Sequence, residues 1–157
     1  MDARLNLFTN QTTAKFLKHL VAAGKSVADT GVPKPTHELM LLRASQINGC
    51  GFCTDMHYKD AIAAGEDPLR LNMVAAWREA TVFTEAERAA LELTEEGTRI
   101  ADAAGGVSDE VWENAAKHYD ENQLAALVAT IAVINAFNRV NVLVRQPAGS
   151  YQAGQFA

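Results

Sequence analysis

Basic residues, proline, cysteine and long apolar runs are all scarce in this chain. Lys and Arg number 14 against 19 Asp and Glu, which gives a net charge of −5 and an isoelectric point near 5.3. Because nucleic-acid recognition requires a basic face, we expect no nucleic-acid partner. No uninterrupted apolar run approaches the roughly 20 residues of a transmembrane helix, so we expect no membrane partner either.

The N-terminus lacks the features of a secretory signal. Residues 1–4 read Met-Asp-Ala-Arg, and no apolar stretch follows a basic start. We therefore expect a cytoplasmic protein. In that reducing compartment a structural disulfide is disfavoured, and the two cysteines, Cys50 and Cys53, are expected to serve catalysis or metal binding.

The composition favours helices. Alanine is abundant, β-branched residues are sparse in most segments, and the chain has only 4 prolines. A length of 157 residues with 48% hydrophobic side chains is sufficient for one domain with its own core. The predicted fold class is all-α, with about seven helices.

Turn and cap signals divide the chain into these helices. Thr84 with Glu87, and Asp120 with Gln123, each form a capping box, and Thr36 is a plausible N-cap. The second helix is apolar nearly all round, which predicts a central position in the core. The seven expected helices span residues 11–28, 36–47, 50–64, 68–77, 84–103, 108–119 and 120–145.

Reactive side chains are concentrated between residues 50 and 57, which read CGFCTDMH. Both cysteines of the chain lie there, spaced C-x-x-C, and His57 follows the second by four residues. In a helix, each residue advances by roughly 100°, so Cys50, Cys53 and His57 fall within about 60° of one another. Two thiols and a base on one helical face indicate either a redox dithiol or a metal site.

A redox dithiol requires a thiolate, whereas a free cysteine has a pKa near ~8.5. Gly49 and Gly51 place the cysteines at a helix N-terminus, where the helix dipole favours negative charge. His57 is placed to accept the proton of Cys53, and Glu38 on the preceding helix is placed to orient His57. Once one thiol is oxidised to a sulfenic acid, the other can attack it and close a disulfide.

Two other interpretations remain open. Glu38, Cys50, Cys53 and His57 form a four-ligand set that suits zinc. Alternatively, the cysteines are two small buried apolar residues, and the protein is a non-catalytic helical oligomer whose thiols only sense oxidation. We find no nucleotide-, flavin- or haem-binding motif, so we predict no cofactor and an electron donor from outside the chain.

The sequence also resembles a known family, the AhpD-like alkylhydroperoxidases of the carboxymuconolactone decarboxylase superfamily. The motif spacing of that family is reproduced by Glu38, Cys50, Cys53 and His57. Three further stretches look like a common bacterial branch of it: 42–50, 76–79 and 134–139. The resemblance covers about Thr36 to Pro147. We therefore expect a single domain, 1–157, with its core at about 36–147 and a tail, 148–157, that is disordered or docked on a partner subunit.

The resemblance implies a helical subunit of a homo-oligomer, a trimer or a hexamer, with the C-x-x-C at the N-terminus of a central helix. The implied activity is reduction of small-molecule organic hydroperoxides by a dithiol, which a dithiol reductant protein then regenerates. In the family mechanism Cys53 attacks the peroxide, activated by His57 and Glu38. Cys50, nearer the helix start and more exposed, resolves the intermediate and exchanges with the reductant.

One residue departs from the family pattern. The best-known peroxidases carry a histidine between the two cysteines, where this chain has Phe52. Phenylalanine cannot relay protons, so proton transfer depends on His57 and Glu38. Phe52 and Met56 are expected to give the site apolar walls, which suit an organic hydroperoxide.

The last predicted helix carries polar residues in an otherwise apolar sequence. These are Asn135, Asn138, Arg139 and Asn141. We expect them to line the cavity near the thiols or to bond across a subunit interface.

Overall fold

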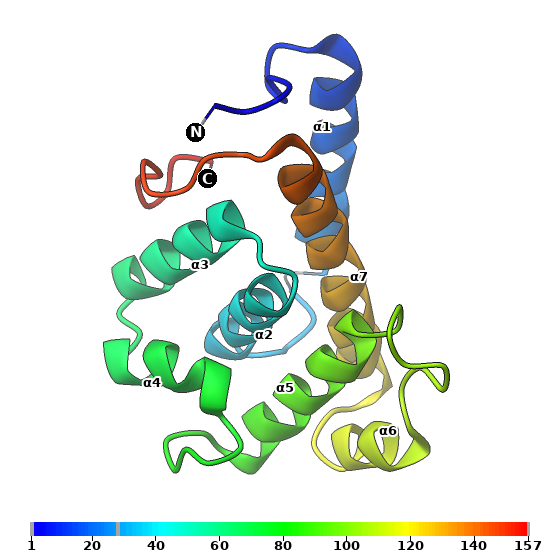
Figure 1. Cartoon of the computed structure of the whole chain (residues 1–157). Coiled ribbons are helices and arrows are strands. Elements are labelled where there is room, and N and C mark those ends of the chain that lie inside the picture. The colour runs from blue at the N-terminus through cyan, green and yellow to red at the C-terminus, as the bar shows by residue number, and fades with distance from the viewer. Residues whose placement is uncertain (1, 28, 157) are drawn as a thin grey trace.

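The computed structural model describes residues 2–27 and 29–156, and every regular element within them is helical (Figure 1). The α-helices are α1 (Gln11–Lys25), α2 (Lys34–Ile47), α3 (Gly51–Ala63), α4 (Pro68–Met73), α5 (Glu85–Thr98), α6 (Asp109–Ala116) and α7 (Glu121–Val144). A short 3₁₀ helix, η1 (Val74–Ala76), follows α4 directly. The predicted all-α fold with about seven helices is confirmed.

Local capping explains where these helices begin. Both predicted capping boxes form, one before α5 and one before α7. The prediction that Thr36 caps α2 is wrong, because α2 begins two residues earlier and Thr36 is buried inside it. Pro35 lies in the first turn of α2, where its missing N–H has no helical partner to lose.

Some helices end earlier than predicted. α1 ends at Lys25, and its predicted end at residue 28 lies outside the described residues. The fourth predicted helix, 68–77, is divided into α4 and η1. α5 ends at Thr98 rather than near residue 103. The Glu96 carboxylate there accepts the Ser108 N–H at 2.7 Å, which folds the following loop back toward the helix.

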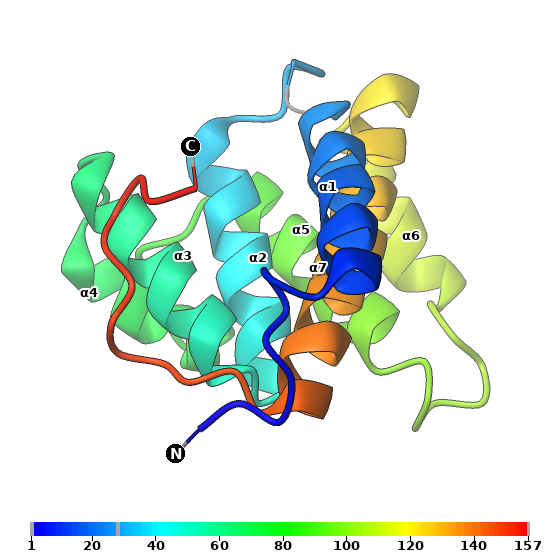
Figure 2. The same ribbon diagram turned by 90° about the horizontal axis from the view of Figure 1, so that it is seen from above.

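α2 lies at the centre of the fold, as its apolar sequence predicts. Figure 1 shows it enclosed by α3, α5 and α7, and Figure 2 shows α1 and α7 on one side of it with α3 and α4 on the other. Met40 packs into a core cluster with side chains of α5, α6 and α7. Leu39 and Leu42 pack into a second cluster with α3, α4, η1 and α5. The two clusters hold α2 between two layers of helices.

The expectation that no segment is apolar enough to span a membrane is wrong for α7. By length and composition alone, this helix is long and apolar enough to cross a membrane. The apolar sequence of α7 is interrupted by three asparagines, Asn135, Asn138 and Asn141. It therefore contains no long uninterrupted apolar run, although its mean hydropathy is high. The core helix of a globular protein passes the same test, and α7 packs along α1, α2 and α5.

Glu95 of α5 is buried and accepts hydrogen bonds from three side chains. The Trp77 indole N–H donates at 3.0 Å and Arg43 Nε at 2.6 Å, and the Arg78 guanidinium bonds the second carboxylate oxygen. Burial alone raises the pKa of the carboxyl, but the three donors outweigh it, so the pKa of Glu95 is lowered. Trp77 is a buried core residue.

Glu95→Ala should lower the free energy of unfolding by about 3 kcal/mol, because Arg43 and the Trp77 indole lose their buried acceptor. The folded-state pKa of Glu95 lies below its unfolded value. Its contribution is therefore complete above the unfolded pKa and is lost as the pH falls through the folded pKa. Urea unfolding near pH 7 and about pH 3 measures this, and the difference between wild type and variant should shrink at the lower pH.

Glu85→Gln is a matched control on the same helix. The Glu85 side chain is 83% exposed, and its only ion-pair contact, with Arg88, is at 4.0 Å among the described residues. This variant should unfold like the wild type. Equal stability of Glu95→Ala and wild type at neutral pH would contradict the role given to Glu95.

Candidate active site

The two cysteines lie where the chain turns sharply from α2 into α3. Gly49 adopts a φ of +65°, a left-handed conformation that favours glycine and terminates α2. Cys50 follows with an extended backbone and is the N-cap of α3, and its sulfur accepts the Cys53 N–H at 3.4 Å. Cys53 lies in the first turn of α3. The turn therefore sets the two sulfurs against each other at the positive end of a helix.

Both thiols are free and buried. Their exposed fractions are 2% for Cys50 and 1% for Cys53. The expectation that Cys50 is clearly the more exposed is therefore not met within this chain. The reason lies in the tertiary structure, because Ala148 packs over the start of α3. A Cβ built on Gly51 would lie 3.4 Å from the Ala148 Cβ.

Hydrogen bonding makes the two thiols unequal. The bond from the Cys53 side chain, with help from the Cys53 and Phe52 backbone N–H groups, lowers the pKa of Cys50 to about 7 despite its burial. The same hydrogen bond between the thiols raises the pKa of Cys53, and burial and the charge on Cys50 raise it further. When the pair loses one proton, the negative charge therefore rests on Cys50, and Cys53 keeps its proton.

His57 and Glu38 meet directly, although they belong to different helices. His57 Nδ1 lies 3.3 Å from Glu38 Oε2, and His57 is buried. Its other ring nitrogen, Nε2, is buried and finds no hydrogen-bond partner among the described residues. With Nδ1 occupied by the carboxylate, Nε2 is the nitrogen free to accept a proton. His57 follows Cys53 by one turn, so the two share a face of α3.

The four side chains proposed as zinc ligands do not form a metal-binding cluster in the part of the chain that the structure describes. Within residues 2–27 and 29–156, no group of three or more His, Cys, Asp or Glu side chains is arranged to hold a metal ion. The Glu38 carboxylate contacts the His57 ring, and the two free thiols are hydrogen-bonded to each other.

Amide side chains of α7 approach the dithiol from the core. Asn141 Nδ2 lies 3.3 Å from the Cys53 sulfur. Asn138 and Asn135 both accept from the Asn48 amide, at 2.9 and 3.0 Å. We expected these polar residues to lie near the thiols or to bond across a subunit interface, and Asn141 lies near a thiol. Asn135 and Asn138 bond the end of α2.

A C-terminal segment, which the sequence did not place near the thiols, covers the site. Residues 146–156, which we call the C-terminal strap, run from the end of α7 along α3 (Figure 1, Figure 2). Lys59 Nζ donates to the carbonyls of Gly149 and Tyr151 at 3.2 and 3.0 Å, and the Tyr151 hydroxyl donates to Asp60 at 2.9 Å. The tail expected to be disordered or docked on a partner is docked on its own chain.

Aromatic side chains join the strap to the C-x-x-C segment. The Phe52 ring, between the two cysteines, has its centroid 6.4 Å from those of both Tyr151 and Phe156. Phe8 stacks on Phe156 at 5.6 Å. Two aromatic residues in a short tail indicate that the tail packs on the protein. The sequence alone does not identify the helix that they contact.

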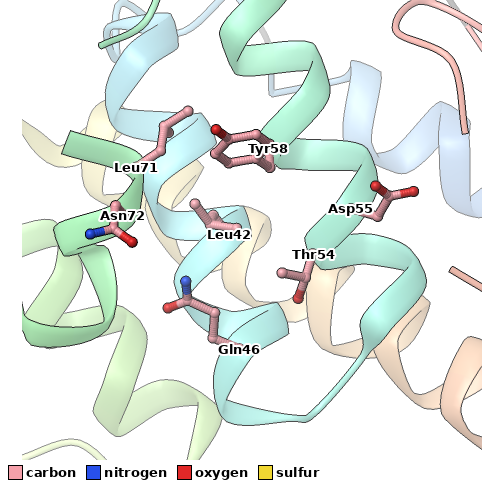
Figure 3. A pocket seen from close by; sticks show the side chains of 7 residues that line it. All are labelled: Leu42, Gln46, Thr54, Asp55, Tyr58, Leu71 and Asn72. Atoms are coloured by element: carbon pink, nitrogen blue, oxygen red, sulfur yellow. The ribbon is translucent and has the colours of Figure 1, made fainter. Parts of the chain in front are cut away.

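The pocket in Figure 3 lies on a different side of α3 from the thiols. It has a volume of about 310 Å³, and Tyr58 of α3 and Leu42 of α2 face each other across it. Its other lining residues are Gln46, Thr54, Asp55, Leu71 and Asn72. Asp55 and Tyr58 therefore face this pocket, whose lining contains no cysteine.

Comparison with known proteins identifies the family. The sequence model of the carboxymuconolactone decarboxylase family matches residues 14–96, a range that includes all four predicted site residues. The chain belongs to this family.

Relatives within the carboxymuconolactone decarboxylase family support the AhpD-like subdivision. The chain is 37% identical over 134 residues to the uncharacterized protein YdfG of Bacillus subtilis, covering 85% of this chain and 90% of that protein. A shorter stretch of 39 residues is 51% identical to the alkyl hydroperoxide reductase AhpD of Rhodopseudomonas palustris, covering 25% of this chain and 22% of that protein.

Solved structures share the fold. A crystal structure from Agrobacterium tumefaciens, of a protein of unknown function with a suggested AhpD antioxidant role, has a TM-score of 0.87 and 31% identity. It covers 96% of this chain and 100% of that one. The debrominase Bmp8 has a TM-score of 0.77 at 17% identity, covering 88% of this chain and 74% of its own, and shares the fold alone. The AhpD-like fold of this carboxymuconolactone decarboxylase family member is established.

The charge distribution of the dithiol predicts a pH profile. Alkylation of Cys50 by iodoacetamide should rise with pH through a midpoint near 7, since only the thiolate reacts. Cys53→Ala should move the midpoint upward, because it removes the side-chain donor. Cys53→Ser, which keeps a donor, should move it less. An unchanged midpoint in Cys53→Ala would contradict the hydrogen bond from the Cys53 thiol to the Cys50 sulfur.

The strap predicts restricted access to the thiols. Tyr151→Ala removes both the aromatic contact with Phe52 and the bond to Asp60, so alkylation of Cys50 should accelerate by about tenfold. Tyr151→Phe keeps the ring and should lie between Tyr151→Ala and the wild type. Alkylation timed by intact mass at fixed pH measures this. Identical rates in all three proteins would show that the strap does not limit access.

Proposed function

We propose that this protein is a thiol-dependent peroxidase that reduces organic hydroperoxides through a Cys50–Cys53 dithiol/disulfide cycle. The observation that carries the proposal is the unequal pair of buried thiols. One thiol is acidic at neutral pH, the other keeps its proton, and the Glu38–His57 pair lies one turn further along α3. A peroxidase needs these parts: a nucleophile, a resolving thiol, and a base with its orienting carboxylate.

In the first step the Cys50 thiolate attacks the outer oxygen of the hydroperoxide. An S–O bond forms and the O–O bond breaks, leaving a sulfenic acid on Cys50 and an alcohol after protonation. The family resemblance gives this attack to Cys53, but the helix-cap position and the hydrogen bonds favour Cys50. The assignment of Cys50 to the attack therefore rests on this structure rather than on the resemblance.

In the second step Cys53 attacks the sulfenic acid of Cys50. The S–S bond forms, the S–O bond breaks, and the proton of Cys53 leaves with the hydroxyl as water. Because the pKa of Cys53 is raised, this step needs a base, and His57 Nε2 is unpartnered and on the same face of α3. Glu38, bonded to Nδ1, orients the ring and stabilises its protonated form.

An external dithiol reductant protein completes the cycle by reducing the disulfide. The sequence contains no motif for an internal electron donor, so two electrons per turnover come from this partner. The substrate side of the proposal is an organic hydroperoxide, since Phe52, between the two cysteines, packs with the strap rings into an apolar cluster beside the dithiol segment. The AhpD relative and the AhpD-like neighbour support the same chemical class.

The proposal also includes a cytoplasmic location and a homo-oligomer, either a trimer or a hexamer. A reducing compartment returns the dithiol to its reduced state. Large apolar side chains remain exposed on α1 and at the end of α7, with exposed fractions of 49% for Phe16 and 70% for Leu143. Exposed apolar side chains of this kind are typical of association surfaces.

Single-turnover reaction with cumene hydroperoxide tests the activity. The reduced protein should lose both thiols and the mass of two hydrogen atoms, at least about a hundredfold faster than free cysteine reacts. His57→Gln should slow disulfide closure, because it removes the base. Thiol counting and intact mass spectrometry follow both steps. Reaction no faster than free cysteine would reject the peroxidase function.

Two serine variants separate the roles of the cysteines. Cys53→Ser should still oxidise rapidly and gain the mass of one oxygen atom, because Cys50 keeps its thiolate and has no resolving thiol. Cys50→Ser should react slowly. The reverse pattern, with fast oxidation only in Cys50→Ser, would return the attack to Cys53.

A further inference from the structure

The Asn141 amide of α7 contacts the sulfur of Cys53. Asn141 Nδ2 lies 3.3 Å from the sulfur of Cys53, and both residues are buried. Asn141 and Cys53 are 88 positions apart in the sequence, so this contact exists only because α7 packs against the start of α3. The contact places a hydrogen-bond donor on the less acidic of the two thiols.

The orientation of this amide is determined by its second contact. The same nitrogen donates to the Phe137 carbonyl at 3.0 Å, one turn back along α7. If the amide were reversed, its oxygen would face both a carbonyl oxygen and the sulfur, and neither is a donor suited to it. Both amide hydrogens are therefore used, one on Phe137 and the other on Cys53.

Asn138 also hydrogen-bonds the thiols and lowers both of their pKa values, but Asn135 and Asn138 each have a hydroxyl acceptor as well. Asn135 donates to the Thr98 hydroxyl at 3.1 Å, and Asn138 donates to the Ser45 hydroxyl at 3.1 Å. A neutral thiol is a much weaker acceptor than a hydroxyl, so Asn141 gains little in the resting state for being buried. It gains most when the sulfur carries a negative charge, because charge-assisted hydrogen bonds are about twice as strong.

We propose that Asn141 is a further catalytic residue, which stabilises the negative charge that develops on the Cys53 sulfur when the disulfide is reduced. The proposal rests on the dithiol cycle proposed above. It concerns the return half of that cycle, in which a thiolate of the reductant enters and one protein sulfur leaves.

The step balances as a thiol–disulfide exchange. A thiolate of the external dithiol attacks the Cys50 sulfur, and a mixed disulfide forms as the Cys50–Cys53 bond breaks. The electron pair of the broken bond goes to the Cys53 sulfur, which becomes a thiolate held by the Asn141 N–H and then takes up a proton. The second thiol of the reductant then attacks the mixed disulfide and releases Cys50 as a thiolate.

Cys53 needs this donor more than Cys50 does. Its bond to Cys50, its burial and the adjacent negative charge all raise its pKa, which makes it a poor leaving group. Asn138 and Asn141 act in the opposite direction and lower that pKa. Cys50, in contrast, has the N–H groups of the helix start.

The first test measures the Cys53 thiol alone, without any hydroperoxide. In a Cys50→Ser background, the pH dependence of iodoacetamide alkylation reports the pKa of Cys53. Adding Asn141→Leu, which is similar in size but has no donor, should raise that pKa by about one unit. Asn135→Leu is the matched control, because it removes a buried amide from the same helix that does not touch sulfur. It should leave the pKa of Cys53 unchanged.

The second test follows reduction of the oxidised protein by dithiothreitol in a stopped-flow instrument. Asn141→Leu should slow the reaction about tenfold, while Asn135→Leu should not. Equal effects of the two variants in both tests would assign Asn141 a structural role only and overturn the proposal. Because neither test uses a peroxide, loss of peroxidase function in the cumene hydroperoxide experiment would leave these results interpretable on their own.

Discussion

The reversal of the chain between α2 and α3 is the constraint on which the candidate site depends. α2 ends at Gly49 in a left-handed conformation, and α3 starts with Cys50 as its cap. A cap side chain accepts N–H groups from the first turn of the helix, whereas a side chain within that turn does not. The two chemically identical thiols therefore acquire different proton affinities, through the hydrogen bond between them and through the N–H groups that the Cys50 sulfur accepts. The charge on Cys50 raises the pKa of Cys53 further.

Polar contacts of α7 link the stability of the fold to the chemistry of the site. Buried amides in an apolar helix are destabilising unless they are hydrogen-bonded. Asn135 and Asn138 meet this requirement by bonding Asn48, directly before the chain reversal. The same stripe continues to Asn141 and reaches the Cys53 sulfur. The contacts that fasten α7 to the chain reversal thus extend to the sulfur of Cys53.

The C-terminal strap divides the site into a rigid base and a cover. The base is formed by α2, α3 and α7, which pack through buried side chains. The cover is held mainly by hydrogen bonds that Lys59 donates and Asp60 accepts, and by partly exposed aromatic rings. Segments held in this way open at lower free energy than a packed core. Opening of such a cover would expose the buried dithiol without unfolding the helices.

The sequence by itself determined the helical class, both capping boxes, the central position of α2 and the chemical inventory of the site. These features are local, because helix start signals and the spacing of side chains on a helix act within about one turn. It also placed Glu38 beside His57, through the spacing of a known motif. The tertiary structure alone decided that Cys50 is as buried as Cys53 and that Asn141 contacts the sulfur of Cys53. These properties depend on how α7 and the strap pack on α3, and contacts between distant segments leave no local pattern in the sequence.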